Sequence, residues 1–151
     1  MSYRKWFDAH AQKHKAIMAT LTHLSDDEVI EYFRFENMVK NEPDFCLLYA
    51  ENKKCHDTVE LNCYLCACPN FRFNDKGFSA EEGKILFSTC AIDSPDGDRF
   101  LTDTAIHQNC TGCLVPHDEG YIKKIFNRNW FAIMKKVPCK ESSKSSGYTV
   151  K

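Results

Sequence analysis

The residues best suited to chemistry lie in the stretch 61–71, which contains Cys63, Cys66 and Cys68. A Cys-x-x-Cys turn directs two thiolates toward one point, which suits a tetrahedral zinc ion or one corner of an iron–sulfur cluster. Cys68 follows so closely that it can serve the same centre or a neighbouring one. We call residues 63–68 the first knuckle. It predicts a metal site that needs further ligands from elsewhere in the chain.

A second Cys-x-x-Cys pair, Cys110 and Cys113, is followed after three residues by His117. Two such pairs indicate metal binding strongly, but they indicate the identity of the metal only weakly. We call residues 110–113 the second knuckle. Further candidate ligands stand alone in the sequence: Cys46, Cys55, His56 and Cys90, with His107 as a less convincing one. The full set can supply two closed four-coordinate zinc sites, and the sequence leaves open which ligands share a site.

The redox compartment can be inferred from the nine cysteines of the chain. They are odd in number and clustered, which favours metal ligation over a disulfide framework. The N-terminal residues carry no apolar run, so we expect neither a signal peptide nor a membrane span. We therefore expect a cytoplasmic protein.

Length and charge restrict the classes of protein. The 151 residues, of which 43% are hydrophobic, predict one compact body with a modest core. A formal net charge of −1 gives no general attraction to nucleic acid or to an anionic membrane. Lysines and aromatic residues alternate between positions 121 and 136, but we interpret this stretch as an amphipathic helix with a solvated lysine face.

The N-terminal part is predicted to be helical. A first helix should cover residues 4–23, with His10 and His14 solvated on its polar face. A second should begin at Ser25, whose side chain can form a capping box with Glu28, and should run to about residue 39. Residues 44–70 show no sustained periodicity, so we expect metal ligation to replace a core there.

The C-terminal part is predicted to contain strands followed by a helix. The expected strands are 71–73, a strand starting at 78, 84–92 and 99–101, and the expected helix is 119–134. The polar residues 138–151 are expected to be disordered.

Together these elements predict an α+β fold. Its centre is a small metal-stabilised, zinc-ribbon-like core with short antiparallel hairpins, flanked by N-terminal helices and one C-terminal helix. We divide the chain into a helical segment at 1–42, a cysteine-rich metal-binding domain with its C-terminal helix at 43–137, and the tail 138–151.

The order of these motifs resembles that of a known family. The motifs are Asn62-Cys63-Tyr64-Leu65-Cys66-Ala67-Cys68-Pro69, then Cys90, then Asn109-Cys110-Thr111-Gly112-Cys113-Leu114-Val115-Pro116-His117. With Phe35-Glu36-Asn37 and Cys55-His56 upstream, residues 33–126 resemble the cysteine-rich small domain family, a metal-binding group described as zinc-finger-like. The gap between Cys46 and Cys55 is longer than in that pattern, and Ala91 follows Cys90 where the family has glycines. The resemblance implies metal binding without a settled activity.

Three functions agree with these features. The first is a non-catalytic protein in which one or two zinc ions hold chain segments together and the surface serves an unknown protein partner. The second is an iron–sulfur or redox protein, because four cysteines can hold a cluster. The third is a metal carrier or a metalloenzyme with His107 or His56 as base. No Ser-His-Asp arrangement, phosphate loop or His-Glu-x-x-His motif supports catalysis, so we expect no enzymatic activity. The oligomeric state stays open.

Overall fold

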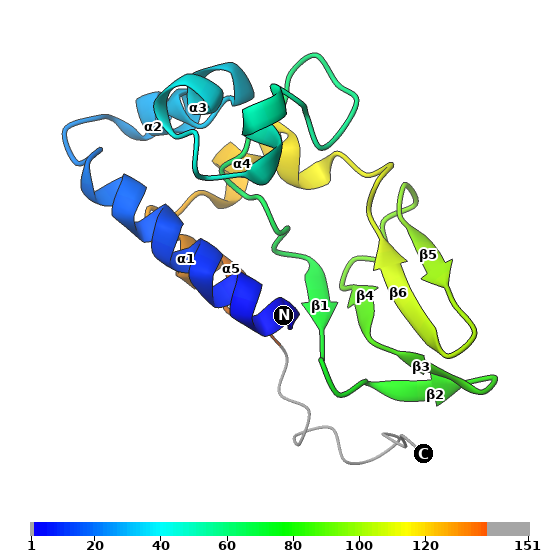
Figure 1. The fold of residues 1–151 in the computed structure, drawn as a ribbon. Helices are drawn as coiled ribbons and strands as arrows, with labels where there is room; N and C mark the ends of the chain where they lie inside the picture. The colour runs from blue at the N-terminus through cyan, green and yellow to red at the C-terminus, as the bar shows by residue number, and fades with distance from the viewer. Residues whose placement is uncertain (1, 139–151) are drawn as a thin grey trace.

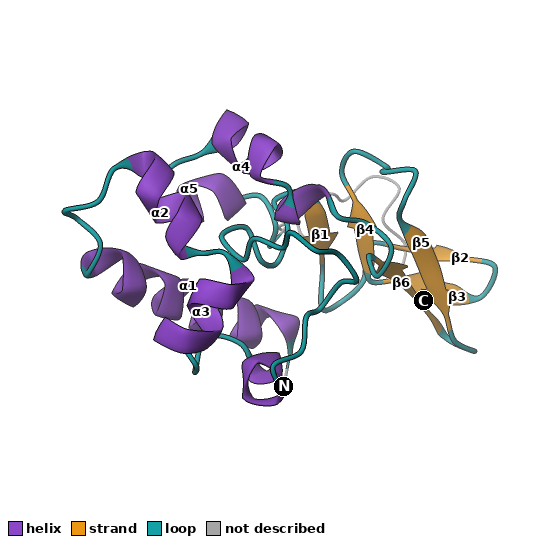
Figure 2. Cartoon of the chain, turned by 90° about the horizontal axis from the view of Figure 1, so that it is seen from above, coloured by secondary structure: helices purple, strands orange, loops and turns teal. Residues whose placement is uncertain are grey.

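The computed structural model describes residues 2–138, which form an α+β fold (Figure 1). The α-helices are α1 (Tyr3–Ala19), α2 (Asp26–Tyr32), α3 (Phe35–Asn41), α4 (Glu119–Ile125) and α5 (Trp130–Met134), and the 3-10 helices are η1 (Leu47–Glu51) and η2 (Val115–His117). The strands are β1 (Phe71–Phe73), β2 (Ser79–Glu81), β3 (Lys84–Leu86), β4 (Ser88–Cys90), β5 (Asp98–Leu101) and β6 (Ala105–Asn109). The α-helices gather on one side of the molecule and the strands on the other (Figure 2). Of the predicted tail, Pro138 is described and forms a bridge with Phe73, whereas residues 139–151 lie outside the described residues.

The second helix begins as predicted but ends early. The capping box is present, since the Ser25 hydroxyl accepts from the Glu28 amide at 3.2 Å and the Glu28 carboxylate accepts from the Ser25 amide at 2.9 Å. The prediction of one helix to about residue 39 is wrong, because α2 and α3 are separate. Between them the Phe33 carbonyl accepts from the Cys63 amide at 2.8 Å. The helix is thus interrupted where the first knuckle pairs with it.

The C-terminal helix is also divided. The predicted helix 119–134 forms α4 and α5, with a break at residues 126–129. The Asn127 side chain accepts from the Asn129 amide at 2.8 Å, and the Asn129 side chain caps α5 by accepting from the Phe131 amide at 3.1 Å. Asparagine side chains that bond to nearby amides compete with continued helix, which explains the break.

The strands form two small sheets. One is the antiparallel pair β1-β4, and the other has the order β2-β3-β6-β5. The expected antiparallel hairpins are present as β2-β3 and β5-β6, and the parallel β3-β6 pair, which was not expected, joins them into one mixed sheet. The predicted strand 84–92 is divided at Phe87, whose carbonyl bonds to Asn74 and whose amide bonds to Ile106. Strand 71–73 is confirmed, strand 99–101 is confirmed within β5, and β6 was not predicted.

One hydrophobic core joins the helices to the first knuckle. Phe7, Phe33 and Met134 are fully buried, and so are Tyr64 and Leu65 of the knuckle. The expectation that residues 44–70 lack a core is therefore wrong. This segment contributes side chains to the main core in addition to its cysteines.

The two histidines of α1 lie inside this core. His10 is 4% exposed and His14 is fully buried, so the prediction that they are solvated is wrong. The His14 ring stacks on Phe33 and Trp130, with centroids 4.9 and 5.4 Å apart. The polar residues of α1 had suggested an exposed face, but Phe45 and Trp130 of α5 pack against both rings.

Across the described residues, none of the helices combines the length and the apolar character that a membrane crossing requires.

Candidate metal centre

The first knuckle is tied to the helical core through the Cys63 amide, which donates to the Phe33 carbonyl, and it is closed by backbone hydrogen bonds of its own. The Cys66 amide donates to the Cys63 carbonyl at 3.2 Å, which closes the turn, and the Cys68 amide donates to Leu65 at 2.9 Å. Ala67 and Cys68 have φ values of 94° and 66°, a left-handed conformation that non-glycine residues rarely adopt. Such backbone strain persists only where the surrounding structure enforces it, and it often accompanies functional sites.

The second knuckle lies between β6 and η2. The Cys113 amide donates to the Cys110 carbonyl at 3.0 Å, which closes the same kind of turn. The η2 helix then places His117, whose amide donates to Leu114 at 2.9 Å. The sheet therefore positions Cys110, and the short helix positions the histidine.

The two knuckles face each other across a cavity of about 300 Å³. Its lining includes most of the predicted ligands: Cys55, His56, Cys66, Cys68, Cys90, Cys110, Cys113 and His117. Cys46 and Cys63 are not among its lining residues, and His107 lies in β6 with its ring stacked on Phe87, 5.4 Å between centroids. All cysteines within residues 2–138 are free thiols. The structure thus gathers ligands from five separate stretches of the chain.

The thiols around the first knuckle form one group, Cys46, Cys55, Cys63 and Cys66. Burial raises the pKa of Cys66 above its usual range, and the neighbouring Cys63, Cys55 and Cys46 raise it further. Burial also raises the pKa of Cys63 to about 12, with added contributions from Cys55 and Cys46. These thiols therefore lie close enough to oppose one another's ionisation, and a cation among them would reverse that effect.

The remaining thiols form a second group, Cys68, Cys90, Cys110 and Cys113. Burial raises the pKa of Cys110 to about 11, and Cys68, Cys113 and Cys90 raise it further. For Cys68 the pKa is raised first by burial and then by Cys90 and Cys113. Pairing of β1 with β4 sets Cys90 opposite Phe71, which brings it to the first knuckle. The sequence had left this division into two groups open.

Both histidines at the cavity have their ring nitrogens oriented by backbone carbonyls. His117 Nδ1 lies 2.9 Å from the Asn62 carbonyl oxygen, and His56 Nε2 lies 3.0 Å from the Cys110 carbonyl oxygen. A carbonyl oxygen only accepts, so each of these nitrogens carries the hydrogen. The other nitrogen of each ring faces Cys55 Sγ, at 3.8 Å for His117 Nε2 and 3.1 Å for His56 Nδ1. Burial lowers the pKa of His117, so its ring stays neutral and keeps a lone pair for a metal.

Cys55, His56 and His117 have ligand atoms that all lie within 4.8 Å of one another. Among the described residues no other set of three His, Cys, Asp or Glu side chains is this close. The thiols of each group are therefore spread wider than in a closed metal centre, and a metal would draw them inward.

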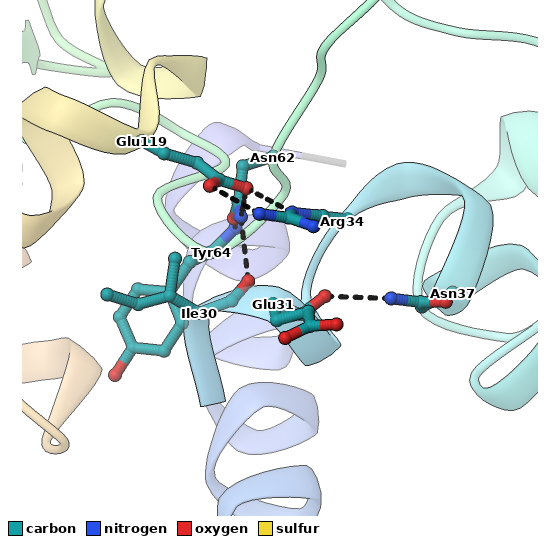
Figure 3. A network of polar contacts seen from close by, with 7 residues as sticks. All are labelled: Ile30, Glu31, Arg34, Asn37, Asn62, Tyr64 and Glu119. Atoms are coloured by element: carbon teal, nitrogen blue, oxygen red, sulfur yellow. Dashed lines mark hydrogen bonds and ion pairs between the residues drawn. The ribbon is translucent and has the colours of Figure 1, made fainter. Parts of the chain in front are cut away.

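A polar network supports the backbone that holds His117 (Figure 3). Asn62 is 1% exposed, and its Nδ2 donates to the Ile30 carbonyl at 2.7 Å and to the Glu119 carboxylate at 3.0 Å. Glu119 also forms a bidentate pair with Arg34 at 2.7 and 3.0 Å. The sequence marked Asn62 only as the first residue of the motif 62–69, and its type and spacing gave no sign of its buried contacts with Ile30 and Glu119.

Comparison of the chain with protein-family models, with curated proteins and with solved structures finds no match.

Proposed function

We propose that the protein binds two zinc ions through the two knuckles and that these ions are structural. The first ion is held by Cys55, Cys63, Cys66 and His117, and the second by Cys68, Cys90, Cys110 and Cys113. In this proposal the pair of sites is the zinc-ribbon-like core of the fold. The observation that carries it is the geometry of His117, whose Nδ1 bonds to a carbonyl while its Nε2 faces a thiol across the shared cavity. Metal-binding histidines have this arrangement almost without exception.

Distances select His117 over His56 as a ligand. Zinc bonds of about 2.3 Å to sulfur and about 2.05 Å to nitrogen place the two ligand atoms roughly 3.6 Å apart at a tetrahedral angle. His117 Nε2 lies 3.8 Å from Cys55 Sγ, close to that value, whereas His56 Nδ1 at 3.1 Å is nearer than two ligands of one ion would be. His56 is therefore left out of the proposed ligand set. Its Nδ1 can accept a hydrogen bond from Cys55 only while that thiol carries its proton, and its Nε2 donates to the Cys110 carbonyl of the second knuckle.

The donor set suits zinc at both sites. Thiolates and neutral imidazole are the ligands of structural zinc, and both knuckles provide the Cys-x-x-Cys spacing that places two sulfurs on one ion. Burial, and after it the neighbouring thiols, raise the pKa of Cys63 and of Cys110, so their thiolates are unfavourable until a cation neutralises them. Four protein ligands leave no position for substrate, so we propose no catalytic role.

The proposed ions would join the two halves of the molecule. The first knuckle belongs to the helical core, whereas Cys110 follows the four-stranded sheet. Structural zinc sites contribute on the order of 10 kcal/mol of apparent binding free energy, which also favours the folded state. The role we propose is that of a metal-stabilised interaction protein with a protein partner, in a reducing compartment such as the cytoplasm.

A second candidate rests on the second group of thiols. Four cysteines without a histidine can also ligate an iron–sulfur cluster, so this group alone fits a redox protein. Elemental analysis of protein purified without added metal, together with its visible spectrum, separates the two. The zinc proposal predicts a colourless protein with two zinc ions per chain, one of which is lost in Cys90→Ser. Brown protein with stoichiometric iron would support the cluster, and folded protein without metal would refute both.

A further inference from the structure

Each knuckle contains one buried cysteine with a buried hydroxyl beside it. Cys63 and Cys113 are 6% and 7% exposed, and the other cysteines within residues 2–138 are more exposed than these two. Tyr49 of η1, 4% exposed, lies next to Cys63, and Ser94, 8% exposed, lies next to Cys113. Neither hydroxyl belongs to the proposed ligand set, so both are available for another role at the sites.

The Ser94 contact has a defined direction when Cys113 is a thiolate. Ser94 Oγ lies 3.3 Å from Cys113 Sγ, and it also accepts a hydrogen bond from the Asp96 amide at 3.3 Å. A metal-bound thiolate carries no proton, so the hydrogen of this contact must come from the serine. The turn that follows is closed by a hydrogen bond of 3.0 Å, which the Gly97 amide donates to the Ser94 carbonyl. This turn holds the Ser94 hydroxyl in place.

The Tyr49 hydroxyl lacks a proper partner. Its oxygen is buried, and no atom within residues 2–138 meets ordinary hydrogen-bond geometry with it. The buried Cys63 thiol is a polar neighbour of this hydroxyl, but at a geometry outside the ordinary hydrogen-bond range. The contact is therefore present but imperfect. Leaving a buried hydroxyl unsatisfied is unfavourable, and a sulfur drawn into a metal site and carrying negative charge would be a stronger acceptor.

We propose that Tyr49 and Ser94 are positioning residues that donate hydrogen bonds to the metal-bound thiolates of Cys63 and Cys113, one at each site. This inference rests on the proposed function. The donated hydrogen bond orients the thiolate and offsets part of its negative charge without touching the ion. Groups of this kind contribute to metal retention, and losing one weakens metal affinity by roughly 10- to 100-fold.

The test compares Tyr49→Phe and Ser94→Ala with two matched controls in the zinc-loaded full chain. Tyr32→Phe removes a hydroxyl whose partner is Glu42, and Ser88→Ala removes a buried hydroxyl bonded to the Gln108 amide. The rate of zinc release to a chromogenic chelator is measured for both equivalents. Each test variant should release one equivalent roughly 10-fold faster or more and leave the other unchanged, and the controls should release both as the unaltered protein does.

Cobalt(II) replacing zinc supplies a second readout, which a purely structural role would not change. Loss of a hydrogen bond makes the thiolate more electron-rich, so the sulfur-to-cobalt charge-transfer band should move to longer wavelength in Tyr49→Phe and Ser94→Ala. Tyr49→Phe should produce this shift in a Cys90→Ser background, which keeps only the first site. Unchanged release rates and unchanged bands in both test variants would overturn the inference. The proposed function would still stand in that case, provided that the unaltered protein binds two zinc ions. Absence of zinc from the unaltered protein would instead refute the proposed function.

Discussion

Acid should destabilise the protein through His14 and His10. Burial lowers the pKa of His14 to about 3 and that of His10 to about 4, and the positive charges of neighbouring His10 and Lys13 respectively lower them further. In the unfolded chain both titrate near the ordinary value of about 6.5. As pH falls below that value the unfolded state takes up protons that the folded state refuses, so the free energy of unfolding decreases until the folded-state pKa values are reached.

The size of the effect follows from these pKa values. A pH of 5 lies about 1.5 units below the pKa of each histidine in the unfolded chain. The free energy of unfolding therefore falls by about 2 kcal/mol for each histidine and by about 4 kcal/mol for both. That is a large part of the roughly 5–15 kcal/mol by which typical domains are stable. Both ring nitrogens of His14 lack hydrogen-bond partners within residues 2–138, so phenylalanine can replace the ring without breaking a hydrogen bond.

The assay is urea denaturation of the unaltered protein and of His14→Phe between pH 7.5 and pH 5. Acid also weakens metal binding, but this contribution is common to both proteins and cancels in their difference. His14→Phe should be at least as stable at pH 7.5 and should gain about 2 kcal/mol relative to the unaltered protein by pH 5. Parallel stability curves over this range would refute the reasoning, because they would show that His14 takes up its proton equally in both states.

Three further predictions concern the metal sites and their support. In native mass spectrometry, Cys63→Ser should lose one of the two zinc ions, whereas Cys46→Ser should keep both. Loss of a zinc ion in Cys46→Ser but not in Cys63→Ser would show that Cys46 is the ligand instead of Cys63. Because Cys55 is exposed, chelator should remove zinc in two phases, and Cys55→Ser should abolish the fast one; a single phase in the unaltered protein would contradict this. Asn62→Ala should lower the free energy of unfolding by roughly 2–4 kcal/mol, since it removes the three hydrogen bonds of a buried side chain, against under about 1 kcal/mol for Asn37→Ala, which removes one exposed hydrogen bond. Equal losses in a urea titration would show that the Asn62 network adds nothing.

Local signals predicted local structure. The capping box at Ser25 and the strand 71–73 depend on residues close together in sequence, and both are confirmed. The helix break at Arg34 depends on pairing with Asn62 across the chain, so no local pattern could reveal it. The burial of His14 depends on aromatic partners from other helices, and its neighbours in α1 gave the opposite impression.

The candidate site follows the same rule. Residue type and spacing were enough to name the cysteines of both knuckles and His117 as candidate ligands. They could not divide the ligands, because Cys90 reaches the first knuckle only through the pairing of β1 with β4. Tyr49 and Ser94 were not singled out, because the role that we propose for each rests on one contact, and tyrosine and serine occur too widely in proteins to mark a site by type.

X-ray absorption at the zinc edge would test the central claim most directly. We expect two zinc ions per chain, with three sulfurs and one nitrogen at the first and four sulfurs at the second, and with sulfur at about 2.3 Å and nitrogen at about 2.05 Å. The averaged spectrum should therefore be dominated by sulfur, with no water or carboxylate oxygen in the coordination shell. An oxygen ligand, or as much nitrogen as sulfur around either ion, would contradict closed structural sites built from the two knuckles.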